Sequence, residues 1–308
     1  MSGKMQVAMK AVLIYNQFAG RSGLREFRNQ CGNSLQTIGI EAAHLDLNHL
    51  RLSELVRGLP LDQYHALLIA GGDGTIYEAV NGYLANPSEK KPPIGVIPVG
   101  TGNSFARDLG LESGNWQQAI RVIAEGKSKM VDLGRFEENG SSRHFANILG
   151  MGFVADVTKR AAGLKWMGNF AYTAATIQRM MSNRPVAATL RLDGQTLERE
   201  CTFITVSNTR YTSNFLIAPQ ARFDDGKLDL LILKHMRRRD LLRNFPKVLN
   251  GSHLELPEVE VFRISEAEII THPEVDLAPD GECTGSTPLK VSCVHRAVPF
   301  FYNAMAEF

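Results

Sequence analysis

Short apolar runs alternate with longer amphipathic stretches over the first half of the chain. Runs of strand length are found at residues 10–15, 42–47, 65–70 and 94–99. The third run has no polar alternation, as expected of a strand buried on both faces. Helical spacing of apolar residues is found at residues 24–38, 52–59, 75–84 and 116–126. Strands that alternate with helices in this way predict an α/β domain built on a doubly wound parallel sheet, which binds ligands beyond the carboxyl ends of its strands.

The pattern changes beyond residue 131, where long alternating strands are joined by turn signals. Residues 185–192 and 195–206 flank Asp193-Gly194, a two-residue hairpin signal. Further strands are predicted at residues 228–234, 259–271 and 289–294. The second half of the chain is therefore predicted to be an antiparallel β domain, either a sandwich or a flattened barrel.

Two glycine-rich bends follow the predicted strands at 65–70 and 94–99. The first is Gly-Gly-Asp-Gly-Thr at 71–75, and the second is Gly-Thr-Gly-Asn at 100–103, ahead of a helix that starts near Ser104. Thr75 and Glu78 are spaced as a capping box at the start of a helix. A strand, a glycine bend and a helix N-terminus together favour a bound phosphate, and Asp73, itself an anion, would need a cation between it and that phosphate. The alternative is a pair of plain strand–turn–helix corners.

Composition limits the kinds of partner and compartment. The 308 residues suit one very large or two ordinary domains, with a hydrophobic share of 44%. With 34 basic and 32 acidic residues the net charge is +2, so we expect no nucleic-acid partner. The four cysteines show no C-x-x-C spacing, which is typical of thiols in a reducing compartment. No secretory signal or run of about 20 apolar residues is found, so a cytoplasmic protein is expected; its oligomeric state is left open.

Three segments carry a resemblance to a known family. They are G-G-D-G-T at 71–75, E-A-V-N-G at 78–82 and P-V-G-T-G-N-S-F-A-R-D-L-G at 98–110. In order and spacing they resemble the catalytic domain of diacylglycerol, sphingosine and ceramide kinases. The resemblance implies an N-terminal nucleotide domain related to NAD kinases and phosphofructokinases, residues 1–131 joined by the tail 297–308, and a lipid-substrate domain at 132–296. The implied ATP-binding residues are Asn16, Gly20, Arg21, Gly71, Gly72, Asp73, Gly74, Thr75, Glu78, Gly100, Thr101, Gly102 and Asn103.

A kinase must also neutralise the phosphates and take a proton from the attacking hydroxyl. Mg²⁺ would serve the first need. For the second, Pro279-Asp280-Gly281-Glu282 resembles the D-G-E motif of the family, in which the general base is assigned; either Asp280 or Glu282 could be that base. Asp73 is a rival, although an aspartate beside Mg²⁺ has a lowered pKa and suits the Mg²⁺·ATP ligand shell better. Without the resemblance, Asp-Gly would indicate an ordinary hairpin turn.

Two further segments resemble sites of the family. Residues 223–228 resemble a structural magnesium loop, with the Asp225 side chain and the carbonyls of Arg222 and Lys227 as ligands; an acidic turn is the alternative. Residues 150–156 resemble sphingosine kinases, in which an aspartate at the place of Asp156 faces the polar head of the lipid; a helix cap is the alternative.

The remaining features suggest contact with lipid. Residues 164–181 form a Met-rich helical stretch that could gate an acyl chain or simply pack in the core. A basic cluster that could dock on anionic lipid, or be a solvated helix face, consists of Lys234, Arg237, Arg238, Arg239, Arg243 and Lys247.

These features predict an ATP- and Mg²⁺-dependent lipid kinase that is peripheral to the membrane. Its substrate would be a hydroxyl of a diacylglycerol-like or sphingoid lipid, reached by transient contact with the membrane surface. One alternative is a kinase like NAD kinase, which shares the G-G-D-G-T element. Another is a non-catalytic regulator that binds nucleotide or lipid on the same scaffold.

Overall fold

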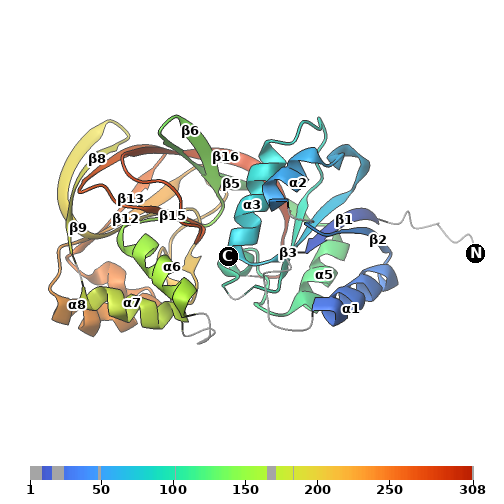
Figure 1. Ribbon diagram of the computed structural model, residues 1–308, viewed down its shortest axis with the longest axis horizontal. Helices are drawn as coiled ribbons and strands as arrows, with labels where there is room; N and C mark the ends of the chain where they lie inside the picture. Colours follow the sequence, from blue (N-terminus) through green and yellow to red (C-terminus); the bar gives the residue numbers. More distant parts are fainter. Residues whose placement is uncertain are drawn as a thin grey trace, which may run out of the picture. The chain divides into compact units, whose positions relative to one another are not determined.

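The structure is a computed structural model that describes residues 9–15, 24–47, 50–100, 102–164, 171–182 and 184–306. The chain forms two compact units, residues 1–130 with 298–308 and residues 131–297 (Figure 1). Of the predicted ATP-binding residues, Asn16, Gly20, Arg21 and Thr101 lie outside the described residues.

The first unit is built on parallel strands in the order β2-β1-β3-β4, with the end of β16 beside β4. Its strands are β1 (Met9–Tyr15), β2 (Ile40–Leu45), β3 (Ala66–Gly71) and β4 (Ile94–Pro98). Its helices are α1 (Leu24–Thr37), α2 (Leu52–Gly58), η1 (Leu61–Gln63), α3 (Asp73–Leu84), α4 (Ser104–Asp108) and α5 (Trp116–Glu125). Figure 1 shows α1 and α5 on one face of this sheet and α2 and α3 on the other. The predicted doubly wound parallel sheet is confirmed.

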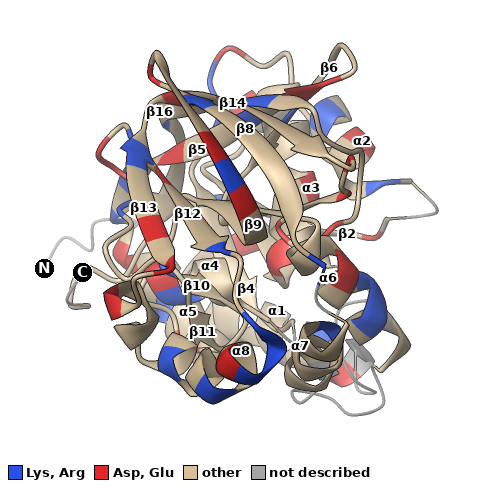
Figure 2. Ribbon diagram, turned by 90° about the vertical axis from the view of Figure 1, so that its left-hand side faces the viewer, with Lys and Arg blue, Asp and Glu red and all other residues tan. Residues whose placement is uncertain are grey.

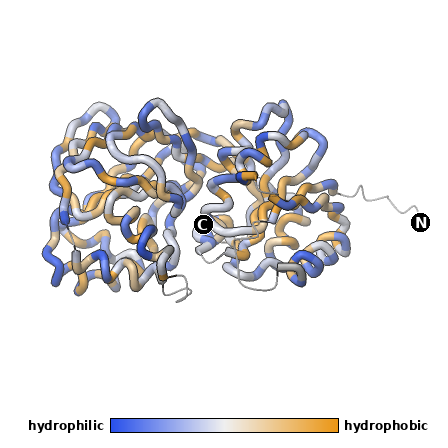
Figure 3. The backbone as a smooth tube through the Cα atoms, in the orientation of Figure 1, coloured by the Kyte–Doolittle hydropathy of each residue, from blue (hydrophilic) through white to orange (hydrophobic). Residues whose placement is uncertain are grey.

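The core of the first unit explains why its strands are apolar throughout. All six residues of β3 are buried, and Leu68 packs with Leu13 of β1, Leu35 of α1 and Ile123 of α5. A strand covered by helices on both faces has no polar side to show, so its sequence does not alternate. In Figure 3 these strands form the orange interior of the unit.

The second unit is an antiparallel, sandwich-like arrangement. Its main strand order is β13-β12-β9-β8-β14-β16, while β7 pairs with β9 and β15, and β5 pairs with β6. The strands up to β11 are β5 (Ser128–Glu138), β6 (Ser141–Phe145), β7 (Ile148–Met151), β8 (Val186–Leu192), β9 (Gln195–Ser207), β10 (Tyr211–Thr212) and β11 (Phe215–Leu216). The remaining strands are β12 (Leu228–Lys234), β13 (Val259–Ile264), β14 (Glu266–His272), β15 (Leu277–Pro279) and β16 (Leu289–Phe301). The predicted antiparallel β domain is confirmed.

Helices in this unit come in two groups. The first is α6 (Phe153–Gly163) with α7 (Ala171–Met181), and the second is α8 (Arg238–Asn244) followed by η3 (Phe245–Leu249) and η4 (Ser252–Glu255). The apolar core of the strands includes Phe136, Phe145, Leu190, Val206 and Ile269. Contacts between α7 and α8 bring the two groups together.

One predicted strand is wrong. Residues 259–271 form two strands, because the strand ends in a bend at Ser265. On one side of the bend β13 pairs with β12, and on the other β14 pairs with β8. The Asp193-Gly194 hairpin explains the break. Both turn residues have positive φ, 43° and 91°, as a two-residue hairpin requires, and the Asp193 carboxylate accepts the N–H groups of Ser265 and Glu266. The hairpin tip thus ends one strand and starts the next.

Candidate active site

The two glycine bends of the first unit lie side by side at the carboxyl ends of β3 and β4. The N–H of Gly100 donates to the carbonyl of Gly71 at 3.3 Å. A side chain on Gly100 would collide with the Cα of Gly72. Glycine is therefore needed here because two backbones meet with no room for a Cβ atom. The pair presents its main chain at the edge of the sheet where ligands of α/β proteins bind.

Asp73 joins the first bend to the helix that follows the second. Its carboxylate accepts the N–H of Ser104 and the N–H of Phe105, each at 3.0 Å, which are the first two residues of α4. Burial raises the pKa of Asp73, and the two N–H donors act in the opposite direction. Asn103, at φ 36°, completes the second bend: its amide oxygen accepts the N–H of Gly100, and its amide nitrogen donates to Ser113. The side chains of Asp73 and Asn103 thus help to hold the two bends in place.

The predicted capping box is wrong. Helix α3 begins two residues earlier than expected, at Asp73, and Gly72 is its N-cap without a side-chain cap. The Glu78 carboxylate instead accepts the N–H and the hydroxyl of Ser53, at 3.2 and 2.5 Å. Glu78 therefore fastens α3 to α2, and its place among the ATP-binding residues stays a prediction.

In the second unit, Asp280 and Glu282 lie in a turn after β15 and differ in environment. Asp280 is buried at φ 46°, and its carboxylate accepts the N–H groups of Ala146, Asn147 and Ile148 at 2.8, 2.9 and 2.9 Å. Three hydrogen bonds to one carboxylate fix the turn against the chain between β6 and β7. Glu282 is exposed. The sequence left the two carboxylates equivalent, and the structure makes one an anchor and the other a surface group.

The predicted magnesium loop is held by protein groups. The Asp225 carboxylate accepts the N–H of Lys227 at 3.0 Å and pairs with the guanidinium of Arg263. This cation already neutralises Asp225, so the arrangement does not favour a metal there, and the loop's magnesium stays a prediction. Arg222 is exposed, and its Nε atom lies 3.4 Å from the carboxylate of Asp224.

Sequence reasoning missed the residue that anchors this loop. Asp132 is fully buried, and its carboxylate accepts the N–H of Gly226 and the N–H of Arg296, both at 2.6 Å. The Nδ1 atom of His295 lies 2.8 Å from the same carboxylate. An isolated aspartate inside a strand carries no motif, so only the fold reveals this role of Asp132.

Asp156 is neither a helix cap nor an isolated carboxylate. The N-cap of α6 is Gly152, and Asp156 is the fourth residue of the helix. Its carboxylate lies 2.7 Å from the Nε of Arg179 in α7. It lines a polar pocket of about 440 Å³ together with Arg179, Phe153, Thr202 and Phe203.

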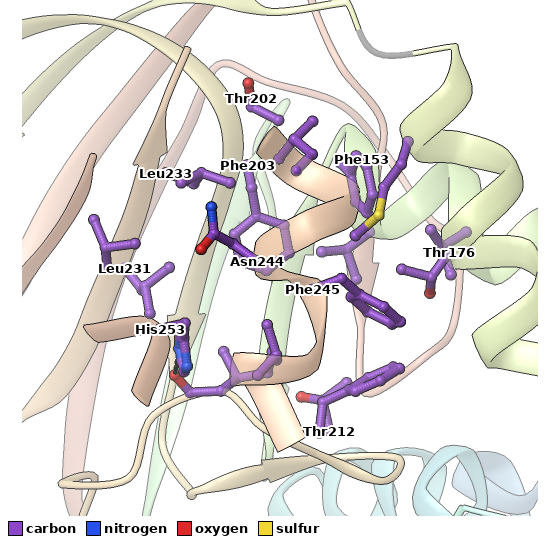
Figure 4. Close-up of a pocket in the computed structure, with 18 of the residues that line it drawn as sticks. Phe153, Thr176, Thr202, Phe203, Thr212, Leu231, Leu233, Asn244, Phe245 and His253 are labelled. Atoms are coloured by element: carbon purple, nitrogen blue, oxygen red, sulfur yellow. Dashed lines mark hydrogen bonds between the residues drawn. The ribbon is translucent and has the colours of Figure 1, made fainter. Parts of the chain in front are cut away.

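An apolar cavity lies beside this polar pocket (Figure 4). It encloses about 110 Å³ between α6, α7, the α8–η3 segment and strands β9 and β12. Its walls include Phe153, Tyr172, Met180, Phe203, Leu231 and Phe245. Helix α7, which lies in the predicted acyl-chain gate, lines this cavity with Tyr172, Thr176 and Met180, whereas Ile177 and Met181 of the same stretch are exposed. Trp166, Met167 and Phe170 lie outside the described residues, and the gate stays a prediction.

The basic cluster lies on and around α8, where Figure 2 shows Lys and Arg gathered. Arg237, Arg238, Arg239 and Arg243 are exposed, while Lys234 pairs with Glu260 at 3.4 Å. Nearby apolar side chains are also exposed: Met181 at the end of α7 and Leu249 at the end of η3, both at 55%.

The described ranges contain neither a membrane-spanning helix nor a cluster of metal-ligating side chains. None of their helices has both the length and the apolar character needed to cross a membrane. Within the same ranges, no three His, Cys, Asp or Glu side chains gather in a way that could hold a metal ion.

The chain combines a parallel α/β unit with paired glycine bends and an antiparallel unit with an apolar cavity, an arrangement that suits a two-domain kinase of a lipid. The diacylglycerol kinase catalytic domain matches residues 10–136, and the YegS C-terminal NAD kinase beta sandwich-like domain matches residues 147–302. The chain belongs to the diacylglycerol kinase family. It is a lipid kinase, and membership of a kinase family implies that it uses ATP.

Individual relatives agree. A diacylglycerol kinase of Mycobacterium tuberculosis is 32% identical, and the matched stretch covers 82% of this chain and 80% of that relative. A diacylglycerol kinase of Bacillus subtilis is 29% identical, and the matched stretch covers 94% of this chain and 95% of that relative. A crystal structure of a diacylglycerol kinase from Bacillus anthracis covers 98% of this chain and 99% of its own, with a TM-score of 0.75 at 23% identity, which shows the fold. A second structure from that organism has a TM-score of 0.81 at 25% identity, with 97% and 99% covered. The NAD kinase and regulator alternatives are not favoured by these matches.

Proposed function

We propose that this chain transfers the γ-phosphoryl group of ATP to a hydroxyl of a diacylglycerol-like lipid. The observation that carries the proposal is the apolar cavity between α6, α7 and α8. A pocket walled by Phe, Leu and Met side chains suits an acyl chain, because transfer of apolar surface out of water is favourable. A soluble nucleotide such as NAD gains nothing from such a pocket.

The glycine bends of the first unit are the proposed binding site of the ATP phosphates. The contact between Gly72 and Gly100 supports this, because it leaves main chain, without side chains, at the carboxyl edge of the sheet. Asp73 acts as a positioning residue that sets the second bend against the first. The first loop, with Asn16, Gly20 and Arg21, stays a predicted part of this site.

Mg²⁺ would neutralise the phosphates during transfer. Kinase sites commonly hold it through one or two carboxylates together with substrate phosphates and water, and Asp73 offers one such carboxylate, whose oxygens also accept the N–H groups of Ser104 and Phe105. Asp73 supplies the carboxylate at the glycine bends and is the predicted ligand of Mg²⁺.

We assign the general base to Glu282. A base needs a carboxylate that can approach the substrate hydroxyl and accept its proton. Asp280 already receives three main-chain N–H groups, whereas Glu282 is exposed at the end of the turn that those bonds hold in place. Asp280 then serves as the positioning residue of the pair.

The lipid would be reached at a membrane surface through the α8 face. The arginines of α8 are exposed, and so are Met181 at the end of α7, which contacts α8, and Leu249 at the end of η3, which follows α8. This combination suits anionic head groups together with acyl chains. Because α7 and α8 also wall the apolar cavity, the same face would admit the chain.

The test is transfer of labelled phosphate from ATP to a panel of acceptors. Diacylglycerol in mixed micelles with an anionic phospholipid should become labelled, and NAD, offered at the same concentration, should not. A protein that labels NAD, or that binds ATP and labels no lipid, contradicts the proposal.

A further inference from the structure

The turn that carries Glu282 takes its position from a short segment between β6 and β7, residues 146–148. The three N–H groups of this segment donate to the Asp280 carboxylate at 2.8–2.9 Å, and the N–H of Asp280 donates to the carbonyl of Ile148 at 2.8 Å. Because hydrogen bonds run in both directions between them, the turn and the segment move together. Whatever holds the segment therefore also sets the place of Glu282.

Asn208 directly follows β9 and holds the segment by its carbonyl groups. The residue is 0% exposed, its side-chain nitrogen donates to the carbonyls of Ala146 and Asp132, both at 2.7 Å, and its N–H donates to the carbonyl of Asn147 at 2.9 Å. Two carbonyl oxygens around one side-chain atom identify that atom as the nitrogen, and both of its hydrogens are then used. Because Asp132 lies in β5, Asn208 fastens the segment to that strand.

Thr209 adds a second hold on the same segment. It is 2% exposed, its N–H donates to the carbonyl of Asn147 at 3.3 Å, and its hydroxyl donates to the side-chain oxygen of Asn147. Asn147 is itself buried and gives its own N–H to the Asp280 carboxylate. A single residue thus lies between the hydroxyl of Thr209 and the carboxylate of Asp280.

This network of polar groups is buried in a unit with an apolar core. Its four members are at most 4% exposed: Asn147, Asn208, Thr209 and Asp280. Buried amide, hydroxyl and carboxylate groups cost free energy unless hydrogen bonds satisfy them, and a satisfied network of this kind is rigid. The chain beyond the turn is fastened separately, because the Glu138 carboxylate accepts the N–H of Ser286 at 3.2 Å. Loss of Asn208 should therefore shift the start of the turn without releasing the whole loop.

We propose that Asn208 and Thr209 are positioning residues of the transfer reaction, which act through residues 146–148 and Asp280 on the place of Glu282. The inference rests on the proposed lipid-kinase function and deepens it by naming the residues that fix the general base. A base takes a proton only within hydrogen-bond reach of the hydroxyl, and a misplacement of about 1 Å can cost about 100-fold in rate. The ATP site proposed at the glycine bends of the first unit does not depend on this placement.

The test measures kcat and KM with ATP and diacylglycerol. Asn208→Ala removes both side-chain donors and should lower kcat by about tenfold or more, with a KM for ATP within about twofold of the wild type. Thr209→Val keeps the shape of the side chain without its hydroxyl and should lower kcat by about threefold or more. Thr209→Ser retains the hydroxyl and should keep kcat within about twofold of the wild type.

A double variant tests whether Asn208 acts through Asp280. Asp280→Asn disturbs the same network at its other end, so Asn208→Ala/Asp280→Asn should have a kcat within about threefold of the slower single variant. Losses in kcat that multiply would mean that the two residues act independently and would overturn the inference.

A buried asparagine of the first unit supplies the matched control. Asn86 is 4% exposed, and its side-chain nitrogen donates to carbonyls at the end of α2, that of Val56 among them at 2.7 Å. Asn86→Ala removes the same kind of hydrogen bond and should lower the melting temperature, with kcat within about twofold of the wild type.

The possible results separate three cases. An unchanged kcat in folded Asn208→Ala, or an equal loss of kcat in Asn86→Ala, overturns the inference. If thermal denaturation shows that Asn208→Ala does not fold, the two Thr209 variants decide: equal kcat values for Thr209→Val and Thr209→Ser overturn it. Absence of transfer by the wild type to every lipid, diacylglycerol included, counts instead against the proposed function.

Discussion

At the scale of single residues, carboxylates that look alike in sequence take different roles through their hydrogen bonds. Asp73 and Asp280 both accept main-chain N–H groups from a neighbouring segment, and Glu78 accepts from Ser53. Each of these carboxylates holds two pieces of chain together. Glu282, at the surface, has the different environment that a group meeting a substrate requires.

This difference predicts separable effects of two substitutions. Glu282→Gln should lower kcat by about 100-fold or more, the range supplied by a general base, with an unchanged melting temperature. Asp280→Asn puts an amide group against buried N–H donors and should lower the free energy of unfolding by about 2 kcal/mol. Steady-state assays and urea denaturation of both variants measure this. Destabilisation by Glu282→Gln equal to that by Asp280→Asn would contradict the division of roles.

His253 gives a prediction for pH. It is buried at the apolar cavity, its Nε2–H donates to the carbonyl of Ile217 at 2.9 Å, and burial lowers its pKa from the ordinary 6.5. Below that pH the unfolded chain binds a proton that the folded chain does not, so the free energy of unfolding should fall as pH drops below about 6.5. His253→Gln should weaken this dependence. Some of it should remain, because His44 and His144 also have lowered pKa values; urea denaturation at several pH values measures both slopes.

At the scale of elements, the contact of the two glycine bends can be tested by adding one methyl group. Gly100→Ala should push the bends apart, lower the free energy of unfolding by about 1–3 kcal/mol and weaken ATP binding. Gly58→Ala is the matched control, since a Cβ there meets nothing within 4 Å. Calorimetric titration with ATP compares the two; equal affinities would mean that the contact does not shape the nucleotide site.

The elements also show how far sequence patterns reach. Residues 65–70 were predictable because burial on both faces leaves a continuous apolar run. The break at Ser265 was not, because it depends on Asp193, more than seventy residues away in the chain, whose carboxylate takes the N–H groups there. The capping roles considered for Glu78 and Asp156 were wrong for the same reason: the partners of these carboxylates, Ser53 and Arg179, lie on other helices. Local patterns predict which segments are strands and helices, whereas side-chain partners depend on the assembled fold.

At the scale of the whole molecule, the α8 face predicts salt-dependent membrane binding. Arg238→Glu/Arg239→Glu should weaken binding to anionic vesicles by at least about 2 kcal/mol, or roughly 30-fold, because each lost basic residue near the surface costs about 1 kcal/mol and each new carboxylate adds repulsion. Arg121→Glu/Lys127→Glu, also exposed, is the control and should bind as the wild type does. Vesicle sedimentation at two salt concentrations measures both. Equal weakening by the two pairs would indicate a general charge effect.

The end of β16 gives a prediction about the stability of the first unit. Phe300 is fully buried, pairs with Ile94 of β4 and packs at 4.9 Å against the ring of Phe105. Phe300→Ala should lower the free energy of unfolding by about 3–5 kcal/mol and reduce ATP binding, although residue 300 is distant in sequence from both glycine bends. Thermal denaturation and ATP titration check the two effects, and an unchanged melting temperature would exclude this role.

The same strand fixes an order of events during synthesis on the ribosome. The sheet of the first unit lacks its last strand until Phe300 and Phe301 have emerged, after residues 131–297 of the β-rich unit have been translated. The β-rich unit is itself complete only a few residues earlier, with residues 289–297 of the same strand. In the cell, the part of the chain that is made earliest is therefore the last to become complete.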